Sequence, residues 1–108
     1  MSKEYILLKE KSDSGIIALN KSVFESIVEI SQDDIEGFQK IPTTRFSKPV
    51  SVKIVKNKLH ISVDVNIKYG ANVNSISKKL QNKIYNNILQ MTGLKTSEIT
   101  INVISFSI

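Results

Sequence analysis

The strictest pattern in this sequence is an alternation of apolar and polar residues from Leu59 to Tyr69. Apolar residues take every second position and polar residues fill the positions between them: Leu59, His60, Ile61, Ser62, Val63, Asp64, Val65, Asn66, Ile67, Lys68 and Tyr69. Successive side chains of a β-strand point to opposite faces of its sheet. We therefore expect a long strand with one face on a hydrophobic core and the other face toward water or a partner.

A second, shorter alternation precedes this strand. Val50, Val52 and Ile54 alternate with Ser51 and Lys53, and the short polar segment 56–58 then leads into the long strand. Two alternating runs joined by so few residues are typical of an antiparallel hairpin. We expect the two strands to pair.

An amphipathic helix is predicted to begin near Asn20 or Ser22. Both are favourable N-cap residues, and Ser22 with Glu25 three residues later fits a capping box. The apolar residues of this region recur at spacings of three and four: Leu19, Val23, Phe24, Ile27, Val28 and Ile30. We expect that face to be buried, with Glu25 and Glu29 on the opposite side.

A longer helix is predicted after Asn72 or Asn74, either of which fits an N-cap. Its apolar residues step by three or four: Val73, Ile76, Leu80, Ile84, Ile88 and Met91. Gly93 is suited to the left-handed conformation that ends many helices, and Leu94 to the apolar contact that accompanies it. The pattern predicts about five turns of helix.

Three weaker patterns predict further strands. They cover residues 15–19, residues 35–41 and a last strand that begins near Ile99. Gly37 indicates a bulge or a close backbone approach. The parity of the apolar residues shifts at Ile104, which indicates a bulge or an end that leaves the sheet. The segment between Pro42 and Pro49 is expected to be a surface loop.

These elements predict an α/β (α+β) fold in the order β-α-β-β-β-α-β. A strand, long helix and strand favour a parallel crossover, whereas the hairpin is antiparallel, so the sheet is expected to be mixed, with three to five strands. Since each helix has a single apolar stripe, we expect a two-layer sandwich with both helices on one face. Residues 15–108 are predicted to form one domain, and residues 1–14 an N-terminal arm that either adds an edge strand or stays loose.

The net charge of +5 is unevenly distributed. Residues 1–39 hold four lysines against eight acidic residues, a net charge of −4, whereas residues 40–95 hold eleven basic residues against Asp64, a net charge of +10. Such a field favours acidic partners without naming one. Nearly all the basic residues are lysine, whereas arginine is better suited to bidentate recognition of phosphate or guanine.

The composition excludes much enzyme chemistry. There is no cysteine, and His60 is the one histidine, so disulfides, thiolate catalysis and histidine-rich or cysteine-ligated metal sites are excluded. We expect His60 to be a solvated strand residue, and Asp33 and Asp34 to lie in a turn. The glycines form no phosphate-binding loop. No catalytic residue, metal ligand or cofactor site is predicted.

The polar strand face carries no aromatic residues, so it lacks the base-stacking surface of an RNA recognition motif. The lysines and asparagines of the second helix, with two strand lysines, form the predicted interaction surface: Lys78, Lys79, Asn82, Lys83, Asn86, Lys53 and Lys68. The sequence has no apolar run of the roughly 20 residues that a spanning helix needs, and no secretory leader pattern. We therefore expect a cytoplasmic protein without a membrane span.

In the order of its motifs, the chain resembles the alkaline shock protein 23 family of bacterial envelope stress response proteins. The resemblance covers residues 15–106 and is most specific in three segments: residues 63–70 ending in Tyr69-Gly70, Leu80-Gln81, and Met91-Thr92-Gly93-Leu94. The Leu19-Asn20 lead into the first helix and the glycine-poor loop between Pro42 and Pro49 depart from the family pattern. The chain is most similar to the short, single-domain branch.

The resemblance implies a non-enzymatic cytoplasmic protein of cell-envelope homeostasis, held near the membrane through a partner. We expect a small scaffold or protein-interaction module whose partner is a second copy or a membrane-anchored protein. The alternative hypothesis is a nonspecific RNA- or DNA-binding protein that uses its lysine-rich face, which predicts binding that weakens steeply with salt.

Overall fold

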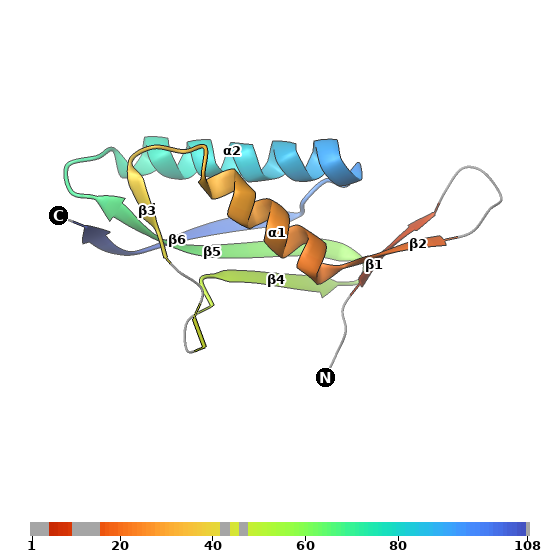
Figure 1. Cartoon of the computed structure of the whole chain (residues 1–108). Helices are drawn as coiled ribbons and strands as arrows, with labels where there is room; N and C mark the ends of the chain where they lie inside the picture. Colours follow the sequence, from red (N-terminus) through yellow and green to blue (C-terminus); the bar gives the residue numbers. More distant parts are fainter. Residues whose placement is uncertain (1–4, 10–15, 42–43, 46–47, 108) are drawn as a thin grey trace.

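Strand β5 (Lys58–Lys68) is the centre of a four-stranded mixed sheet (Figure 1). Strand β4 (Val50–Val55) pairs antiparallel with its first half, and β3 (Phe38–Lys40) with its last residues. Strand β6 (Glu98–Ser107) runs parallel to it along the other edge. This computed structural model describes residues 5–9, 16–41, 44–45 and 48–107. The predicted mixed sheet is confirmed.

The alternation along β5 divides the sheet into a dry face and a wet face. Leu59, Ile61, Val63, Val65 and Ile67 are at most 2% exposed, whereas the residues between them are partly or fully exposed. Full burial of one such aliphatic side chain is worth about 1.5–3 kcal/mol, so this strand supplies a large part of the core.

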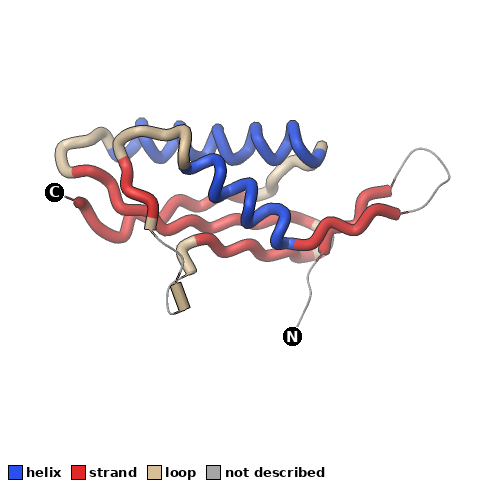
Figure 2. Tube along the Cα trace, in the orientation of Figure 1, coloured by secondary structure: helices blue, strands red, loops and turns tan. Residues whose placement is uncertain are grey.

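Helices α1 (Lys21–Gln32) and α2 (Val73–Thr92) cover the dry face together, as Figure 2 shows. Both contribute to one hydrophobic core with β5, and α1 also packs along α2. The predicted two-layer sandwich with both helices on one face is confirmed. The wet face has no helix over it in the described part of the chain (Figure 1).

The predicted orientation of α1 is partly wrong. Phe24, Ile27 and Val28 are buried, but Val23 is 38% exposed and Ile30 is 53% exposed. The buried face instead continues through Ser31 and Gln32, because α1 packs against α2 as well as against the sheet. The buried face of α1 therefore differs from the predicted stripe.

The N-cap of α1 is Asn20, whose side-chain Oδ1 accepts a 3.0 Å hydrogen bond from the Ser22 backbone N–H. Ser22 therefore lies inside the first turn, and the predicted capping box with Glu25 is not the cap that forms.

Helix α2 follows the prediction closely. Ile76, Leu80, Ile84 and Ile88 are buried, and Asn72 caps the helix by accepting a hydrogen bond from the Ser75 backbone N–H. Its C-cap is Gly93 with φ of +77°. Met91 was expected in the stripe but is 59% exposed, since it lies in the last turn of the helix.

Gly37 makes the close approach that its position predicted, although β3 is shorter than the expected strand 35–41. A Cβ at Gly37 would lie 2.5 Å from Ile76 Cδ1, and the residue has φ of +95°. The β4–β5 turn is made by Lys56 and Asn57, with φ of 51° and 60°. Positive φ at both central residues is typical of a type I′ hairpin turn.

Strands β1 (Tyr5–Lys9) and β2 (Ile16–Asn20) form a separate antiparallel ribbon that extends from the body of the molecule (Figure 1). The first predicted strand, residues 15–19, is thus paired with the arm and not with the main sheet. Residues 1–4 and 10–14 of the predicted arm lie outside the described residues, as does part of the predicted loop 42–49.

The predicted irregularity at Ile104 is confirmed as a bulge in β6. Val65 is opposite Val103 and Asn66 is opposite Ser105, so Ile104 is the extra residue. Ile104 and Phe106 are both more than half exposed.

Candidate functional site

The outer face of α2 is a polar surface with positive charge. Lys78, Lys79, Asn82 and Asn86 are exposed there. The helix contains no aspartate or glutamate. Because its inner face is buried in the core, α2 presents these four side chains from a fixed support. This surface, the α2 face, contains four of the seven residues predicted as an interaction surface.

Lys83 lies at the border of the α2 face. Its Nζ is 3.4 Å from an Asp34 carboxylate oxygen, and the Lys83 side chain is 39% exposed. The ion pair joins α2 to the segment that follows α1. Exposed pairs of this kind contribute little stability, but they neutralise the lysine for other partners. Lys83 is therefore less available to an anionic partner than Lys78 or Lys79.

Lys53 and Lys68 belong to the wet face of the sheet. Lys53 is opposite His60 in the β4–β5 ladder, and Lys68 is the last residue of β5. Both residues are exposed. Since the helices cover the other side of the sheet, the structure divides the predicted interaction surface between two opposite faces. The seven residues do not form one patch.

The wet face is fixed by side-chain hydrogen bonds between β5 and β6. Asn102 Nδ2 donates to Ser62 Oγ at 2.9 Å and to Asp64 Oδ1 at 3.0 Å. Farther along, Ser105 Oγ donates to Asn66 Oδ1 at 2.6 Å. These bonds orient the polar groups in advance, so a partner that docks here meets an ordered surface.

A shallow depression of about 340 Å³ lies on the wet face beside these residues. Its polar lining comes from three strands: Ser51, Lys53, His60, Ser62, Glu98, Thr100 and Asn102. His60 is half-buried on the outward side of β5, which is the side that the alternation predicted. The depression offers hydrogen-bonding groups and both signs of charge.

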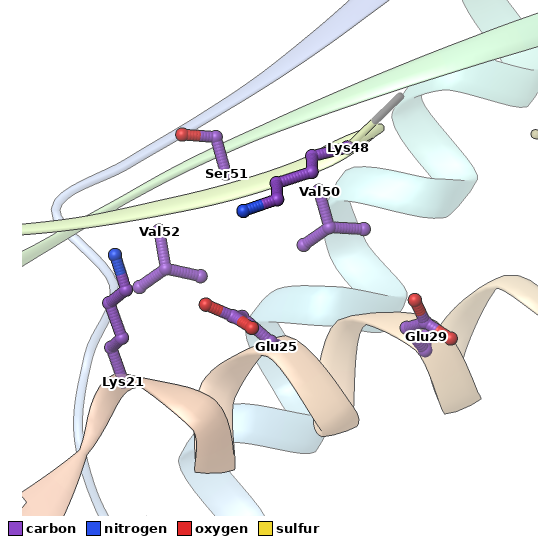
Figure 3. A pocket seen from close by; sticks show the side chains of 7 residues that line it. All are labelled: Lys21, Glu25, Glu29, Lys48, Val50, Ser51 and Val52. Carbon is purple, nitrogen blue, oxygen red and sulfur yellow. The ribbon is translucent and has the colours of Figure 1, made fainter. Parts of the chain in front are cut away.

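A second cavity, of about 360 Å³, lies between α1 and β4 (Figure 3). Val50 and Val52 of β4 line one side of it, and Glu25 with Glu29 of α1 line another. The Lys21 and Lys48 side chains and the Glu25 carboxylate extend toward the same space in Figure 3. Two ammonium groups and two carboxylates offset one another, so the cavity favours neither an anion nor a cation.

The sequence did not predict the cavity between α1 and β4. Glu25 and Glu29 were expected on the side of α1 away from the core, but both are half-buried and line the cavity. Both residues lie beside the buried face of α1, on the side that meets β4. A pattern within one helix does not show which of its flanks a neighbouring strand will cover.

No group of three or more histidine, aspartate or glutamate side chains in the described residues is placed to hold a metal ion. Neither described helix is long and apolar enough to cross a membrane.

Comparison with known proteins places the chain in a family. Searches of curated proteins and of solved structures found no significant match. A family model matches residues 9–108, which include β2, both helices and the whole main sheet. Its description is the alkaline shock protein 23 family, with a cell envelope-related function. The chain therefore belongs to the alkaline shock protein 23 family, whose function is related to the cell envelope.

Proposed function

We propose that this protein is a non-enzymatic interaction module of the bacterial cell envelope that docks on an acidic protein partner through its α2 face. The observation that carries the proposal is the chemistry of that helix. Lys78 and Lys79 are exposed beside Asn82 and Asn86, and α2 has no acidic residue to neutralise them.

The α2 face suits an acidic protein surface in both charge and geometry. Adjacent lysines supply six N–H donors on flexible stems, and the asparagine amides add hydrogen-bonding groups of both kinds. Complementary charge of this sort speeds encounter and sets orientation more than it adds raw affinity. The strongly basic stretch 40–95 extends the attraction beyond direct contact.

The family's envelope-related function supports a location near the membrane. We infer a cytoplasmic protein that is held there by a membrane-anchored partner and that takes part in the stress response of the envelope. In this proposal the α2 face binds the anchored acidic partner and so recruits the protein to the membrane.

Nucleic acid is a poorer fit to the same surface. Binding along a phosphate backbone needs many basic groups on one continuous track. Lys53 and Lys68 lie on the wet face, and Lys83 is paired with Asp34, so within the described residues the α2 face keeps Lys78 and Lys79 without an ion pair. This arrangement of the lysines favours an acidic protein partner over RNA or DNA.

The proposal is tested by reversing the charge of this face and of a matched control. Lys78→Glu with Lys79→Glu changes the net charge by the same amount as Lys53→Glu with Lys56→Glu, whose sites lie in the β4–β5 hairpin. A photo-crosslinking residue at Asn82 reports the partner in cells. We expect the α2 variant to lower crosslinking about tenfold and the hairpin variant to leave it nearly unchanged.

Two further probes distinguish the partner classes. The purified protein is mixed with vesicles that contain phosphatidylglycerol and with a single-stranded RNA oligonucleotide. An acidic, membrane-anchored protein identified at Asn82, with weak binding to both probes, supports the proposal. Equal loss of crosslinking in both variants, or tight salt-sensitive binding to RNA that Lys78→Glu with Lys79→Glu abolishes, would overturn it.

A further inference from the structure

Strand β6 is an edge strand whose first part, Glu98–Val103, lacks the usual protection, because its bulge lies only at Ile104. Among the described strands it pairs with β5 alone. Natural proteins guard open edges with lysine, proline, bulges or short length. Although β6 is 10 residues long, its one charged residue is Glu98, and it has no lysine, arginine or proline. The β6 edge is therefore nearly neutral, although the chain as a whole is rich in lysine.

The opposite edge of the main sheet is different. Strand β4 contains Lys53, and Lys56 and Lys58 follow at its turn. Lys48 precedes β4 and lines the α1–β4 cavity with Lys21. An approaching strand would meet several positive charges along this edge. The two long edges therefore differ in their capacity to accept another strand.

The three side chains of α2 nearest the open edge are uncharged, and exposed Lys78 lies beside them. Gln81 Nε2 donates a 3.1 Å hydrogen bond to the Ile99 carbonyl of β6, which places Gln81 on the β6 side of the helix. Ser77 and Tyr85, four residues before and after Gln81, follow the same side. All three residues are half-buried. The neutral strip thus includes both the strand and the neighbouring helix surface.

The apolar residues of β6 are also incompletely covered. Ile99, Ile101 and Val103 pack against the core but are only half-buried. Their partners Ile61, Val63 and Val65 on β5 are almost completely buried. A further strand beside β6 would bury more of this apolar surface and gain about 25 cal/mol per Å².

We propose that two copies of this chain pair through their β6 strands, antiparallel and about a twofold axis, to form one continuous sheet. The bulge at Ile104 limits regular pairing to the segment Glu98–Val103. Glu98 stands at one end of that segment, so antiparallel pairing puts the two Glu98 carboxylates at opposite ends. Identical neutral edges meet without the repulsion that two lysine-bearing edges would suffer.

The pairing closes as a dimer. A twofold contact uses the same surface on both copies, and it consumes the β6 edge of each. The edges that remain outside are the lysine-bearing β4 edges, which resist further strands. This inference goes beyond the proposed function, because the purified protein alone tests it whether or not an acidic partner exists.

The natural chain contains no cysteine, so single cysteines give a clean test. Directly opposed residues of antiparallel strands have Cα atoms ~4.5–5.5 Å apart, within the ~4.4–6.8 Å range of disulfides. We would place cysteine at Glu98, Thr100 or Asn102 of β6, all exposed, and at exposed Ser51 of β4 as the control. Mild oxidation should give a disulfide-linked dimer that is strongest at one β6 position and weak at Ser51→Cys.

A second experiment measures association without a crosslink. Sedimentation equilibrium of the unmodified chain should show reversible dimers of the 12.1 kDa protomer. Thr100→Lys should weaken dimerisation about tenfold by restoring edge protection, whereas Thr100→Gln should not. Circular dichroism confirms that both variants fold. A monomer at every concentration, an unchanged dimer in Thr100→Lys, or crosslinking at Ser51→Cys equal to that in β6 would each refute the proposal.

Discussion

Asn87 of α2 donates a 2.8 Å hydrogen bond from its side-chain Nδ2 to Ser31 Oγ of α1. Ser31 is completely buried, and its hydroxyl donates in turn to the Ile27 carbonyl at 2.7 Å. The two helices therefore share a polar contact within an interface that is otherwise largely apolar.

This contact predicts a measurable coupling energy between the helices. Asn87→Ala and Ser31→Ala should each lower the free energy of unfolding by about 1 kcal/mol, because each removes a partner from a shielded hydrogen bond. The double variant should lose less than the sum of the two, with a coupling of about 0.5–1.5 kcal/mol in urea denaturation. Exposed Asn86→Ala is the control. Full additivity would contradict the structure.

Gly37→Ala should be the most damaging of three glycine substitutions. All three positions have positive φ, but a Cβ meets Ile76 Cδ1 only at Gly37, whereas Gly70 and Gly93 have open space around them. We expect Gly70→Ala and Gly93→Ala to cost about 1 kcal/mol from backbone strain, and Gly37→Ala to cost a further 1–3 kcal/mol, roughly, from overpacking.

A compensating variant isolates the packing part of the Gly37 effect. Ile76→Val removes the Cδ1 atom that a new Cβ would meet. Thermal unfolding of Gly37→Ala with Ile76→Val should therefore show a smaller loss than the two single variants predict by addition. A loss equal to the sum would mean that the contact with Ile76 Cδ1 does not account for the effect.

The helix caps give a second stability test. Asn20→Ala and Asn72→Ala should each cost about 1 kcal/mol, since each side chain accepts a backbone hydrogen bond at 3.0 Å. Ser22→Ala should change stability by less than about 0.5 kcal/mol, because Ser22 lies inside the first turn. Chemical denaturation measures all three. A large effect of Ser22→Ala would favour the capping box that the sequence predicted.

The β4–β5 turn can be improved. Lys56 and Asn57 both adopt positive φ, which asparagine and glycine tolerate better than lysine. Replacing the pair by Asn-Gly should raise the unfolding free energy by about 1 kcal/mol, because it relieves backbone strain at positive φ, and the midpoint of thermal unfolding should rise. A lower midpoint would show that the Lys56 or Asn57 side chain stabilises the turn; Lys56→Asn alone distinguishes the two.

The fold was largely predictable because its strongest constraint is local. The alternation from Leu59 to Lys68 assigns each residue to one of two faces, and the burial of β5 follows it position by position. Likewise, Gly93 and Gly37 were interpreted correctly because a positive φ or a close approach restricts the residue at that point. Strand alternation and glycine conformation depend on residues that are close in the sequence or on few contacts.

The buried face of α1 and the partner of β2 depend on distant residues and were predicted less well. Val23 and Ile30 fit an amphipathic stripe, yet both are exposed, whereas Ser31 is buried and bonded to Asn87 of α2. Residues 16–20 look like a strand of the main sheet, but they pair with β1. Periodicity identifies an element without identifying its neighbours.

The sequence predicted which residues are exposed and basic, but not how they are arranged in space. Lys78 and Lys79 share the exposed face of α2, as their spacing indicated. Lys53 and Lys68 were grouped with them by charge, although the sheet separates them from α2. The bonds of Asn102 with Ser62 and Asp64 depend on the parallel register of β5 and β6, which no local pattern reveals.

Every strand of the main sheet has its backbone partner in β5, which fixes the order in which the sheet can be completed. During synthesis, β3 and β4 leave the ribosome before or with β5, but β6 follows only after the 20 residues of α2. The backbone amide groups on one side of β5 therefore stay unpaired until α2 and β6 have been translated. The nascent chain is most vulnerable to misassociation in that interval.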